Sequence, residues 1–280
     1  MESWLFFILN FWYSKIYNKL FFLFLRLEKL ILYPSTPKKI LFSNNKEGWK
    51  RLITKRFRYS VHKVYFDEIT SKNSRGYDLV VPFTIQELNN KEIQRMLVNN
   101  PMKLPSIECI LLCDDKYQFN NTLISKGLER FIPGFAKNQT YPYMLKKRID
   151  EFGQNTHIIY SSKEEEQFSE LLNSTEYFCQ EIVTGKVEYA THIYIENRKI
   201  VRSLNVKYIF NNEINIKGKD KSIKVIGRCP YQKEFTTVLA AIGYEGLCCI
   251  NYKVKDNLPL IIEINPRFGA SLCSYFTLFV

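Results

Sequence analysis

The chain has 280 residues, of which 46% are hydrophobic and 24% are charged, and its 40 Lys and Arg against 28 Asp and Glu give a formal net charge of +12. This composition is typical of a globular chain of about two domains or one large α/β unit, and it excludes an intrinsically disordered chain. The cations lie in short, scattered runs, so the charge indicates a solvated basic surface or attraction to an anionic membrane or phosphorylated ligand, and no nucleic-acid partner is expected.

Residues 1–33 form an apolar, aromatic segment that is predicted to be an amphipathic helix. Charged residues interrupt it, so no charge-free stretch reaches the length that a membrane-spanning helix needs, and it has no signal-peptide pattern. On a helical wheel its polar residues fall within a sector of roughly 140°: Ser14, Asn18, Lys29, Lys15, Arg26 and Lys19. We expect such a helix to lie in a membrane interface, with its apolar side toward the lipid. The alternative is that the apolar face packs on the protein's own core or on a partner protein.

After a Pro-containing linker at residues 34–38, the first half of the chain alternates strands with helices. This alternation predicts a mainly parallel sheet, and hence a Rossmann-like α/β domain over residues 39–113. The predicted strands cover residues 39–43, 61–66, 77–82 and 107–112. The predicted helices cover residues 48–57, 86–98 and 116–126, the last ended by Gly127.

The second half is predicted to be α+β with an antiparallel sheet, in a domain over residues 114–280, because its strands follow one another through turns. The predicted strands are 143–146, 157–160, 177–180, 189–195, 200–210, 248–254 and 260–264. The predicted helices are 164–172 and 235–242.

The seven cysteines are odd in number and lack zinc-type spacing, which favours buried thiols in a reducing, cytoplasmic compartment. The three histidines, His62, His157 and His192, have no Ser or Cys partner in a recognisable arrangement. They are therefore interpreted as polar strand residues, and a hydrolase triad has no support.

The most informative string is the Glu-Ile-Asn-Pro-Arg run that begins at Glu263. Glu263 and Asn265 are two residues apart on a strand, so both side chains point to one face and can present oxygen ligands to Mg²⁺. Asn251 lies on the preceding strand, where it can face Glu263 across the hairpin. Arg267 follows the proline and can offer its planar fork to a carboxylate or phosphate.

Several motifs in a fixed order resemble the ATP-grasp superfamily, over roughly residues 38–272. The string at residues 263–267 is similar to that of the carbamoyl-phosphate synthetase and biotin carboxylase branch. Residues 78–82 look like the closing strand of the N-terminal domain, and residues 152–155 stand in the place of a glycine-rich flap. Residues 179–185 look like the adenine-binding hinge.

The resemblance implies roles for individual residues. Lys116 and Lys146 match phosphate-contacting lysines, and Gln180 and Glu181 lie in the hinge that contacts adenine. Glu188 matches the carboxylate that holds the ribose hydroxyls. The magnesium ligands would be Glu263 and Asn265, with Asn251 in a weaker role, and Arg267 with Lys146 would be catalytic. Arg202 and Lys207 are secondary candidates for the nucleotide site.

The activity implied is that of an ATP- and Mg²⁺-dependent carboxylate–amine ligase (Mn²⁺ being a possible substitute) that acts through an acyl phosphate. With the helix predicted over residues 1–33, we expect this ligase to be held at the inner face of a membrane. The substrates would be a small carboxylic acid and an amine. The alternative is a degenerate ATP-grasp protein that binds nucleotide or a partner without turnover. Three departures from the family pattern leave open whether this is a minimal version, a truncated one or that alternative: Asn251 is neutral, the flap has Gly153 as its single glycine, and the sequence ends 13 residues after Arg267.

Overall fold

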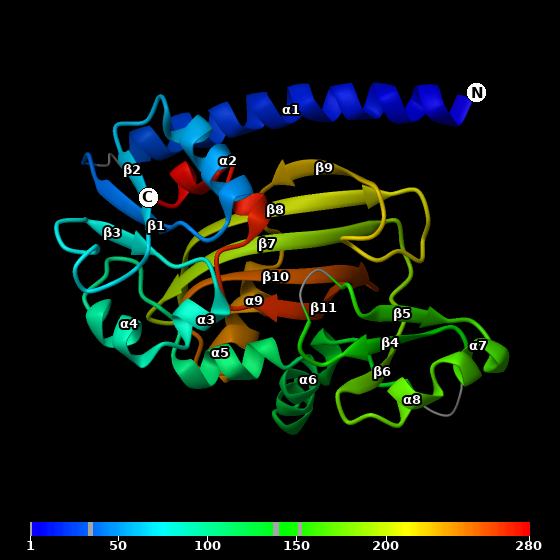
Figure 1. The fold of residues 1–280 in the computed structure, drawn as a ribbon. Helices are drawn as coiled ribbons and strands as arrows, with labels where there is room; N and C mark the ends of the chain where they lie inside the picture. Colours follow the sequence, from blue (N-terminus) through cyan, green and yellow to red (C-terminus); the bar gives the residue numbers. More distant parts are fainter. Residues whose placement is uncertain (1, 33–35, 137–139, 151–152) are drawn as a thin grey trace.

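The computed structural model describes residues 2–32, 36–136, 140–150 and 153–280, with only the backbone described for residues 2–10. Three sheets organise these residues (Figure 1). One is parallel, with strand order β2-β1-β3, and two are antiparallel, with orders β11-β10-β7-β8-β9 and β5-β4-β6. The expected change from a parallel sheet to antiparallel sheets along the chain is therefore confirmed.

The parallel sheet consists of β1 (Lys39–Ser43), β2 (Lys63–Asp67) and β3 (Leu79–Val81), with α2 (Glu47–Phe57) connecting the first two strands. The helix predicted over residues 86–98 is instead two short helices, α3 (Ile85–Leu88) and α4 (Lys91–Met96). Asn90 divides them, because its side chain accepts hydrogen bonds from the amides of Glu92 and Ile93 and so caps a new helix.

The strand predicted over residues 107–112 is wrong, since this segment forms helix α5 (Ile107–Asp114). A short apolar run can form either a buried helix or a buried strand, and in this segment the N-cap residue favours the helix. The Ser106 side chain accepts a hydrogen bond from the amide of Cys109, which starts the helix. Helix α6 (Lys116–Ser125) follows as predicted, with Asp115 as its cap, and Gly127 has a left-handed φ of 69° just beyond its end.

The second half contains the predicted strands and one more. The small sheet comprises β4 (Tyr143–Lys147), β5 (Thr156–Ile159) and β6 (Tyr177–Glu181), with α7 (Ser162–Gln167) and α8 (Ser169–Leu172) in place of one predicted helix. The large sheet comprises β7 (Val187–Glu196), β8 (Lys199–Phe210), β9 (Ser222–Gly227), β10 (Gly246–Lys255) and β11 (Leu258–Asn265), with α9 (Gln232–Ala241) between β9 and β10. The edge strand β9 was not predicted.

The five-stranded sheet separates two hydrophobic cores, and this separation decides which side chains reach the site. On β10, Cys248, Ile250 and Tyr252 belong to the core shared with α5, α6 and α9. The alternate residues point to the opposite face, because successive strand residues face opposite ways. Asn251 and Lys253 therefore lie on the face that looks toward the small sheet and α2.

Helix α1 (Glu2–Leu32) lies along β9 and the C-terminal segment (Figure 1). From its polar sector, Asn18, Arg26 and Lys29 contact the body of the protein. The Asn18 side chain donates to the Lys224 carbonyl at 2.7 Å and accepts from the Ile226 amide at 2.8 Å. Arg26 donates to the Tyr59 carbonyl at 2.6 Å. Asn18 faces inward because β9 is an edge strand whose outer backbone groups need partners.

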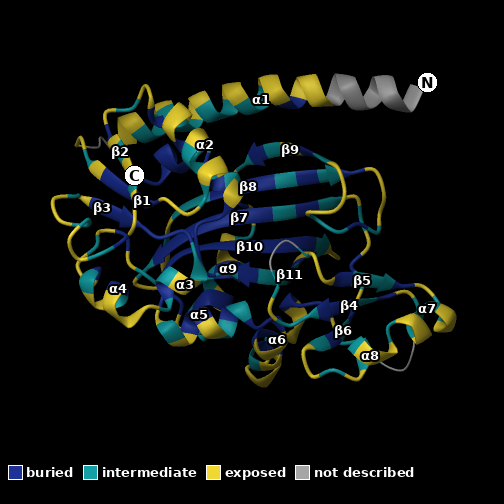
Figure 2. Ribbon diagram, in the orientation of Figure 1, coloured by how far each residue is buried: buried dark blue, intermediate teal, exposed yellow. Residues whose placement is uncertain are grey.

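The opposite side of α1 is consequently turned away from the protein and is exposed (Figure 2). Along this outer arc, which spans roughly 120° of the helical wheel, every described residue is apolar or aromatic and at least 49% exposed: Trp12, Tyr13, Ile16, Leu20, Leu23, Phe24, Leu27, Leu30 and Ile31. The apolar side of α1 thus does not pack on the protein's own core along these positions. Among the described residues, no helix has the length and apolarity required to cross a membrane.

Candidate functional site

A cavity of about 620 Å³ lies between the large sheet, the small sheet and the first two turns of α2. Nine of the eleven predicted site residues line it: Lys116, Lys146, Gln180, Glu181, Glu188, Asn251, Glu263, Asn265 and Arg267. They come from α6, β4, β6, β7, β10, β11 and the segment after β11, so the fold gathers residues that lie up to 151 positions apart in the sequence.

The antiparallel pairing of β10 and β11 builds the floor of the cavity. Asn251 stands directly opposite Glu263 in the register, as predicted. The Asn251 amide donates to Glu263 Oε1 at 2.5 Å, and the Asn265 amide donates to the same oxygen at 3.0 Å. One carboxylate oxygen thus accepts from two side-chain amides, which fixes the orientation of Glu263.

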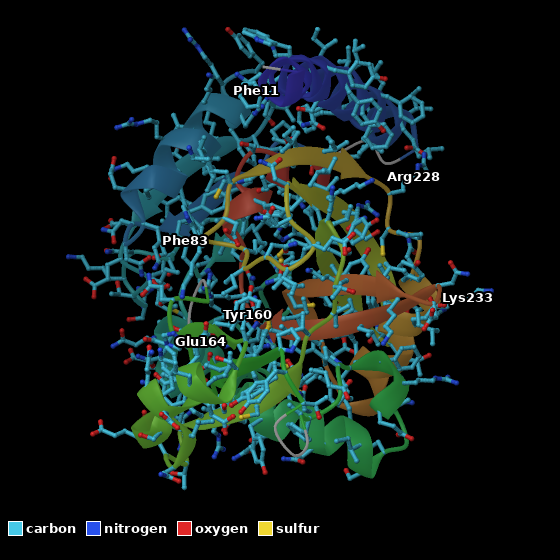
Figure 3. All side chains as sticks on the ribbon, turned by 90° about the vertical axis from the view of Figure 1, so that its right-hand side faces the viewer. Phe11, Phe83, Tyr160, Glu164, Arg228 and Lys233 are labelled. Carbon is cyan, nitrogen blue, oxygen red and sulfur yellow. The ribbon has the colours of Figure 1, made fainter. Side chains whose placement is uncertain are left out.

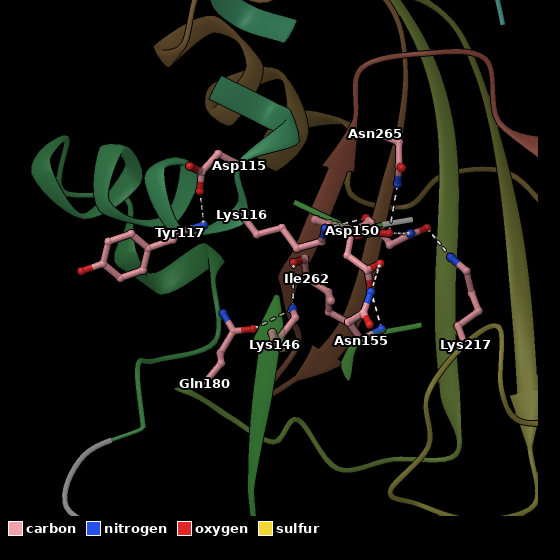
Figure 4. Close-up of polar contacts among 12 residues, drawn as sticks. Asp115, Lys116, Tyr117, Lys146, Asp150, Asn155, Gln180, Lys217, Ile262 and Asn265 are labelled. Atoms are coloured by element: carbon pink, nitrogen blue, oxygen red, sulfur yellow. Dashed lines mark hydrogen bonds and ion pairs between the residues drawn. The ribbon is translucent and has the colours of Figure 1, made fainter. Parts of the chain in front are cut away.

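Two lysines reach this floor from other elements (Figure 4). Lys116, the first residue of α6, places its Nζ 3.5 Å from Glu263 Oε2 and donates to the Asp150 carbonyl at 2.9 Å. Lys146 on β4 donates to Gln180 Oε1 at 3.0 Å and to the Ile262 carbonyl at 3.4 Å. Burial, with the nearby Lys116 ammonium second, lowers the pKa of Lys146 to about 8.

The charge of Glu263 is stabilised by its surroundings. Burial alone raises a carboxyl pKa, but the ammonium groups of Lys116, Lys217 and Lys146 outweigh it and hold the pKa of Glu263 at about 2. Glu188 on β7 differs, because burial keeps its pKa raised even though Lys217 opposes this effect. The cavity therefore combines one firmly ionised carboxylate with a surplus of cations.

The predicted hinge lies at the end of β6, where Gln180 and Glu181 line the cavity together with Val183. Gln180 is fully buried and holds two groups, since it accepts from Lys146 and donates to the Pro133 carbonyl at 3.3 Å. Lys253, which sequence reasoning missed, braces the same segment by donating to the carbonyls of Val183 and Gly185 at 3.0 and 3.1 Å. Its position two residues after Asn251, hence on the same face of β10, was a usable signal.

Lys217 is the most important residue that the sequence did not reveal. It lies in the loop between β8 and β9, and its ammonium donates to Asn251 Oδ1 at 2.5 Å (Figure 4). The same ammonium lies 3.4 Å from Glu188 Oε1. The sequence offers only a basic run over residues 217–224, in which nothing distinguishes the inward lysine from the exposed ones. Only the unpredicted strand β9 and its loop place it.

Arg267 is buried beside the cavity and meets an apolar wall from the N-terminal half of the chain. Its guanidinium carbon lies 6.0 Å from the ring centre of Trp49 on α2, and Nη1 donates to the Phe268 carbonyl at 3.3 Å. The loop that follows is fixed by fully buried His192, whose Nε2 lies 2.7 Å from Ser271 Oγ. Burial, with Lys217 second, lowers the pKa of His192 to about 3, so the ring is neutral.

Two predicted residues do not reach the cavity, although both lie on β8. Tyr208 lines the cavity, and Lys207, next to it, points to the other face of the sheet. Arg202 lies near the far end of the strand, opposite Tyr194 and close to Lys29 of α1. The sequence placed both on the correct strand but could not give its register. In the flap, Gly153 lines the cavity, while Phe152 lies outside the described residues.

The donor set fits one hard cation. Glu263 offers an ionised carboxylate, and Asn265 offers an amide oxygen beside it, which is the oxygen chemistry that Mg²⁺ requires. Asn251 fits less well, because its oxygen already accepts from Lys217. In the part of the chain that the structure describes, no three His, Cys, Asp or Glu side chains form a cluster able to hold a metal alone.

Comparisons with known proteins agree with this geometry. A family model described as an ATP-grasp domain matches residues 113–271. No curated protein sequence matches the chain. Among solved structures, the fold is similar to phosphoribosylamine–glycine ligase from Thermotoga maritima, with a TM-score of 0.63, 14% identity, and coverage of 85% of this chain and 71% of that one.

Two further structures share the fold at comparable similarity. L-amino acid ligase from Bacillus licheniformis has a TM-score of 0.58 and 14% identity, over 86% of this chain and 70% of that one. D-alanine–D-alanine ligase from Bacillus anthracis in complex with ATP has a TM-score of 0.52 and 12% identity, over 83% of this chain and 87% of that one. At these identities the similarity shows the fold alone.

Proposed function

The chain belongs to the ATP-grasp family, and on that premise we propose that it is an ATP- and Mg²⁺-dependent ligase that joins a small carboxylic acid to an amine through an acyl phosphate. The observation that carries this proposal is the cluster at the cavity floor. There the half-buried carboxylate of Glu263 lies 3.5 Å from the Lys116 ammonium, and the ammonium groups of Lys146 and Lys217 also act on its charge. Such a cluster suits a ligand with several phosphate charges.

Each of the cavity residues would have its own role in phosphoryl transfer. An oxygen of the acid would attack the γ-phosphorus and ADP would leave, after which the amine would attack the acyl carbon and phosphate would leave. In such a transfer, catalysis consists mainly of positioning and charge neutralisation. Lys116 and Lys146 would hold phosphate oxygens, and Arg267 would hold the acid or its acyl phosphate against Trp49. A magnesium ion held by Glu263 and Asn265 would neutralise charge on the phosphates when bound.

The nucleotide base would lie at the other end of the cavity, with the ribose between the base and the floor, because Glu188 lies 3.4 Å from Lys217. The segment of Gln180, Glu181 and Val183 lines that end and is braced by Lys253, so its backbone groups are held in place for a planar base. Glu188 would accept from the ribose hydroxyls. This assignment rests on the family pattern together with the lining residues.

The test is the capture of the acyl phosphate. Purified protein is incubated with Mg-ATP, hydroxylamine and a panel of amino and carboxylic acids, and hydroxamate and ADP are measured together. We expect equal amounts of both with at least one acid. Binding of Mg-ATP without hydroxamate from any acid would overturn the ligase proposal and favour the degenerate alternative, a nucleotide-binding protein without turnover.

A neighbouring pair of lysines supplies the matched control. Lys146 points into the cavity, whereas Lys147 points out of the same strand and pairs with Glu176 at 3.2 Å. Lys146→Met should abolish hydroxamate formation, and Lys147→Met should leave it within about twofold of the natural protein. Equal effects of the two substitutions would contradict the assignment of the cavity.

We also propose that α1 holds the protein at the surface of an anionic membrane. The outer arc of α1 is wholly apolar and exposed over its described residues, which suits burial of that side among lipid acyl chains. Two exposed cations of α1, Lys15 and Lys19, lie on the side of the helix next to this arc. Figure 3 draws the side chains over the whole molecule, with Phe11 of α1 labelled.

Vesicle binding by the full chain tests this proposal. Co-sedimentation is measured with vesicles of phosphatidylcholine alone and with 30% phosphatidylserine, and we expect binding that is stronger with the anionic lipid. Leu20→Gln with Leu27→Gln should abolish binding, whereas Val98→Gln with Leu111→Gln, at exposed apolar positions elsewhere, should not. No binding to either vesicle, or dimers that disappear with the α1 substitutions, would overturn the lipid assignment in favour of a protein partner.

The proposed location is the cytoplasm, at the inner face of a membrane. All seven cysteines are free thiols, and six of them are buried. This fits a reducing compartment, where ATP is also available.

A further inference from the structure

The Lys217 ammonium is held in one place by groups from three strands. It donates to Asn251 Oδ1 on β10, lies 3.4 Å from Glu188 Oε1 on β7, and lies 5.1 Å from the ring centre of Tyr208 on β8. Its own loop is fixed as well, because the Ile216 amide donates to the Asp220 carboxylate at 2.7 Å. Lys217 is therefore part of the cavity wall rather than a surface side chain folded inward.

Asn251 uses both of its polar ends in this arrangement. Its amide nitrogen donates to Glu263 Oε1, while its oxygen accepts from Lys217. A carboxylate at residue 251 would instead face the Glu263 carboxylate at hydrogen-bond distance, and the two negative charges would require a cation between them. The amide removes that requirement, since it is a donor toward Glu263 and an acceptor toward Lys217.

The charges around the floor support the same conclusion. Lys116, Lys146 and Lys217 carry three positive charges, against two potential negative charges on Glu188 and Glu263. The cation that contacts Asn251 directly is the ammonium of Lys217, which also lines the cavity. The position that a second metal ion would take beside residue 251 thus already holds a positive charge.

We propose that this site takes a single divalent cation, held by Glu263 and Asn265 with the nucleotide phosphates, and that Lys217 supplies a built-in positive charge on the Asn251 side in place of a second ion. This inference rests on the proposed nucleotide site. It makes Lys217 a binding residue for the phosphates and Asn251 the residue that positions it.

The experiment counts metal ions in the complex. The full-length protein is titrated with Mn²⁺ in the presence of a non-hydrolysable ATP analogue, and bound Mn²⁺ is measured by electron paramagnetic resonance while bound analogue is measured separately. We expect one Mn²⁺ per bound analogue. Two Mn²⁺ per bound analogue would overturn the inference and leave the proposed function standing, whereas absence of analogue binding would overturn the proposed function itself.

A double substitution tests the cause. Asn251→Asp with Lys217→Met replaces the amide by a carboxylate and removes the fixed charge, so the count should rise from one to two Mn²⁺ per bound analogue. Lys221→Met, at an exposed lysine near the same loop, should leave the count at one. A count that stays at one in the double variant, with analogue still bound, would show that Lys217 and Asn251 do not exclude the second ion. If the double variant does not fold, the count in the natural protein decides.

Discussion

Glu263→Gln is the substitution whose effect the structure defines most closely. The change keeps the shape of the side chain and removes its charge, in a place where three ammonium groups hold the pKa of the carboxyl at about 2 instead of the ordinary 4.5. A difference of this size corresponds to about 3 kcal/mol of stability from the ionised form, because each pKa unit is worth about 1.4 kcal/mol. We therefore expect Glu263→Gln to lower the free energy of unfolding of the nucleotide-free protein by about 3 kcal/mol at pH 7.

The stability difference between the natural protein and Glu263→Gln should depend on pH. A carboxyl whose folded pKa is lowered stabilises the fold above its unfolded pKa, and this contribution is lost as the pH falls toward the folded pKa. The difference between the natural protein and Glu263→Gln should thus be largest at pH 5–7 and should shrink to about 1 kcal/mol near pH 3. Urea unfolding at several pH values, followed by circular dichroism, measures it.

A surface carboxylate provides the control. Glu176 pairs with Lys147 at 3.2 Å but its side chain is 66% exposed, so Glu176→Gln should cost less than about 1 kcal/mol. A Glu263→Gln protein as stable as the natural one at pH 7, or a difference that does not narrow in acid, would refute the view that this carboxylate balances the lysines.

The pKa of Lys146 at about 8 predicts that affinity for a non-hydrolysable ATP analogue, measured by calorimetry, weakens up to tenfold per pH unit above pH 8, as the ammonium is lost; constant affinity from pH 7 to 9 would contradict this. Asn18→Ala removes both contacts with β9 and should lower the unfolding free energy by about 1–3 kcal/mol, with faster hydrogen exchange at the Ile226 amide; unchanged exchange would argue against the contact. Gly246→Ala should lower the melting temperature, because a Cβ there would lie 2.7 Å from the Lys103 carbonyl at a φ of 103°, whereas Gly48→Ala, in a helix with open space, should raise stability by about 0.5–1 kcal/mol.

The sequence predicted the part of the site that lies on β10 and β11, because the spacing of residues along a strand determines which side chains share a face. Glu263 and Asn265 share a face because strand residues alternate, and Asn251 faces Glu263 because a short hairpin joins their strands. The phosphate-binding lysines could be placed only through the family pattern, since nothing local distinguishes Lys146 from Lys147. Lys217 could not be predicted, because its position depends on the register of β8 and β9.

The same distinction explains the errors in the fold. The segment 107–112 has the apolar composition of a buried strand, and a single cap at Ser106 turns it into a helix. Strand β9 has alternating polar residues that also suit a loop, and it becomes a strand only by pairing with β8. The contacts that Asn18 of α1 makes with the body of the protein depend on the open edge of that unpredicted strand.

The pairing of Asn18 with the Lys224 carbonyl and the Ile226 amide has a consequence for handling the protein. β9 is an edge strand of the large sheet. An uncovered edge strand exposes a row of backbone donors and acceptors that can pair with a strand of another molecule. A deletion of residues 1–33, made to remove the exposed apolar arc of α1, would uncover this sheet edge. A shortened version should therefore aggregate by strand addition at β9, although it lacks the exposed apolar residues of α1.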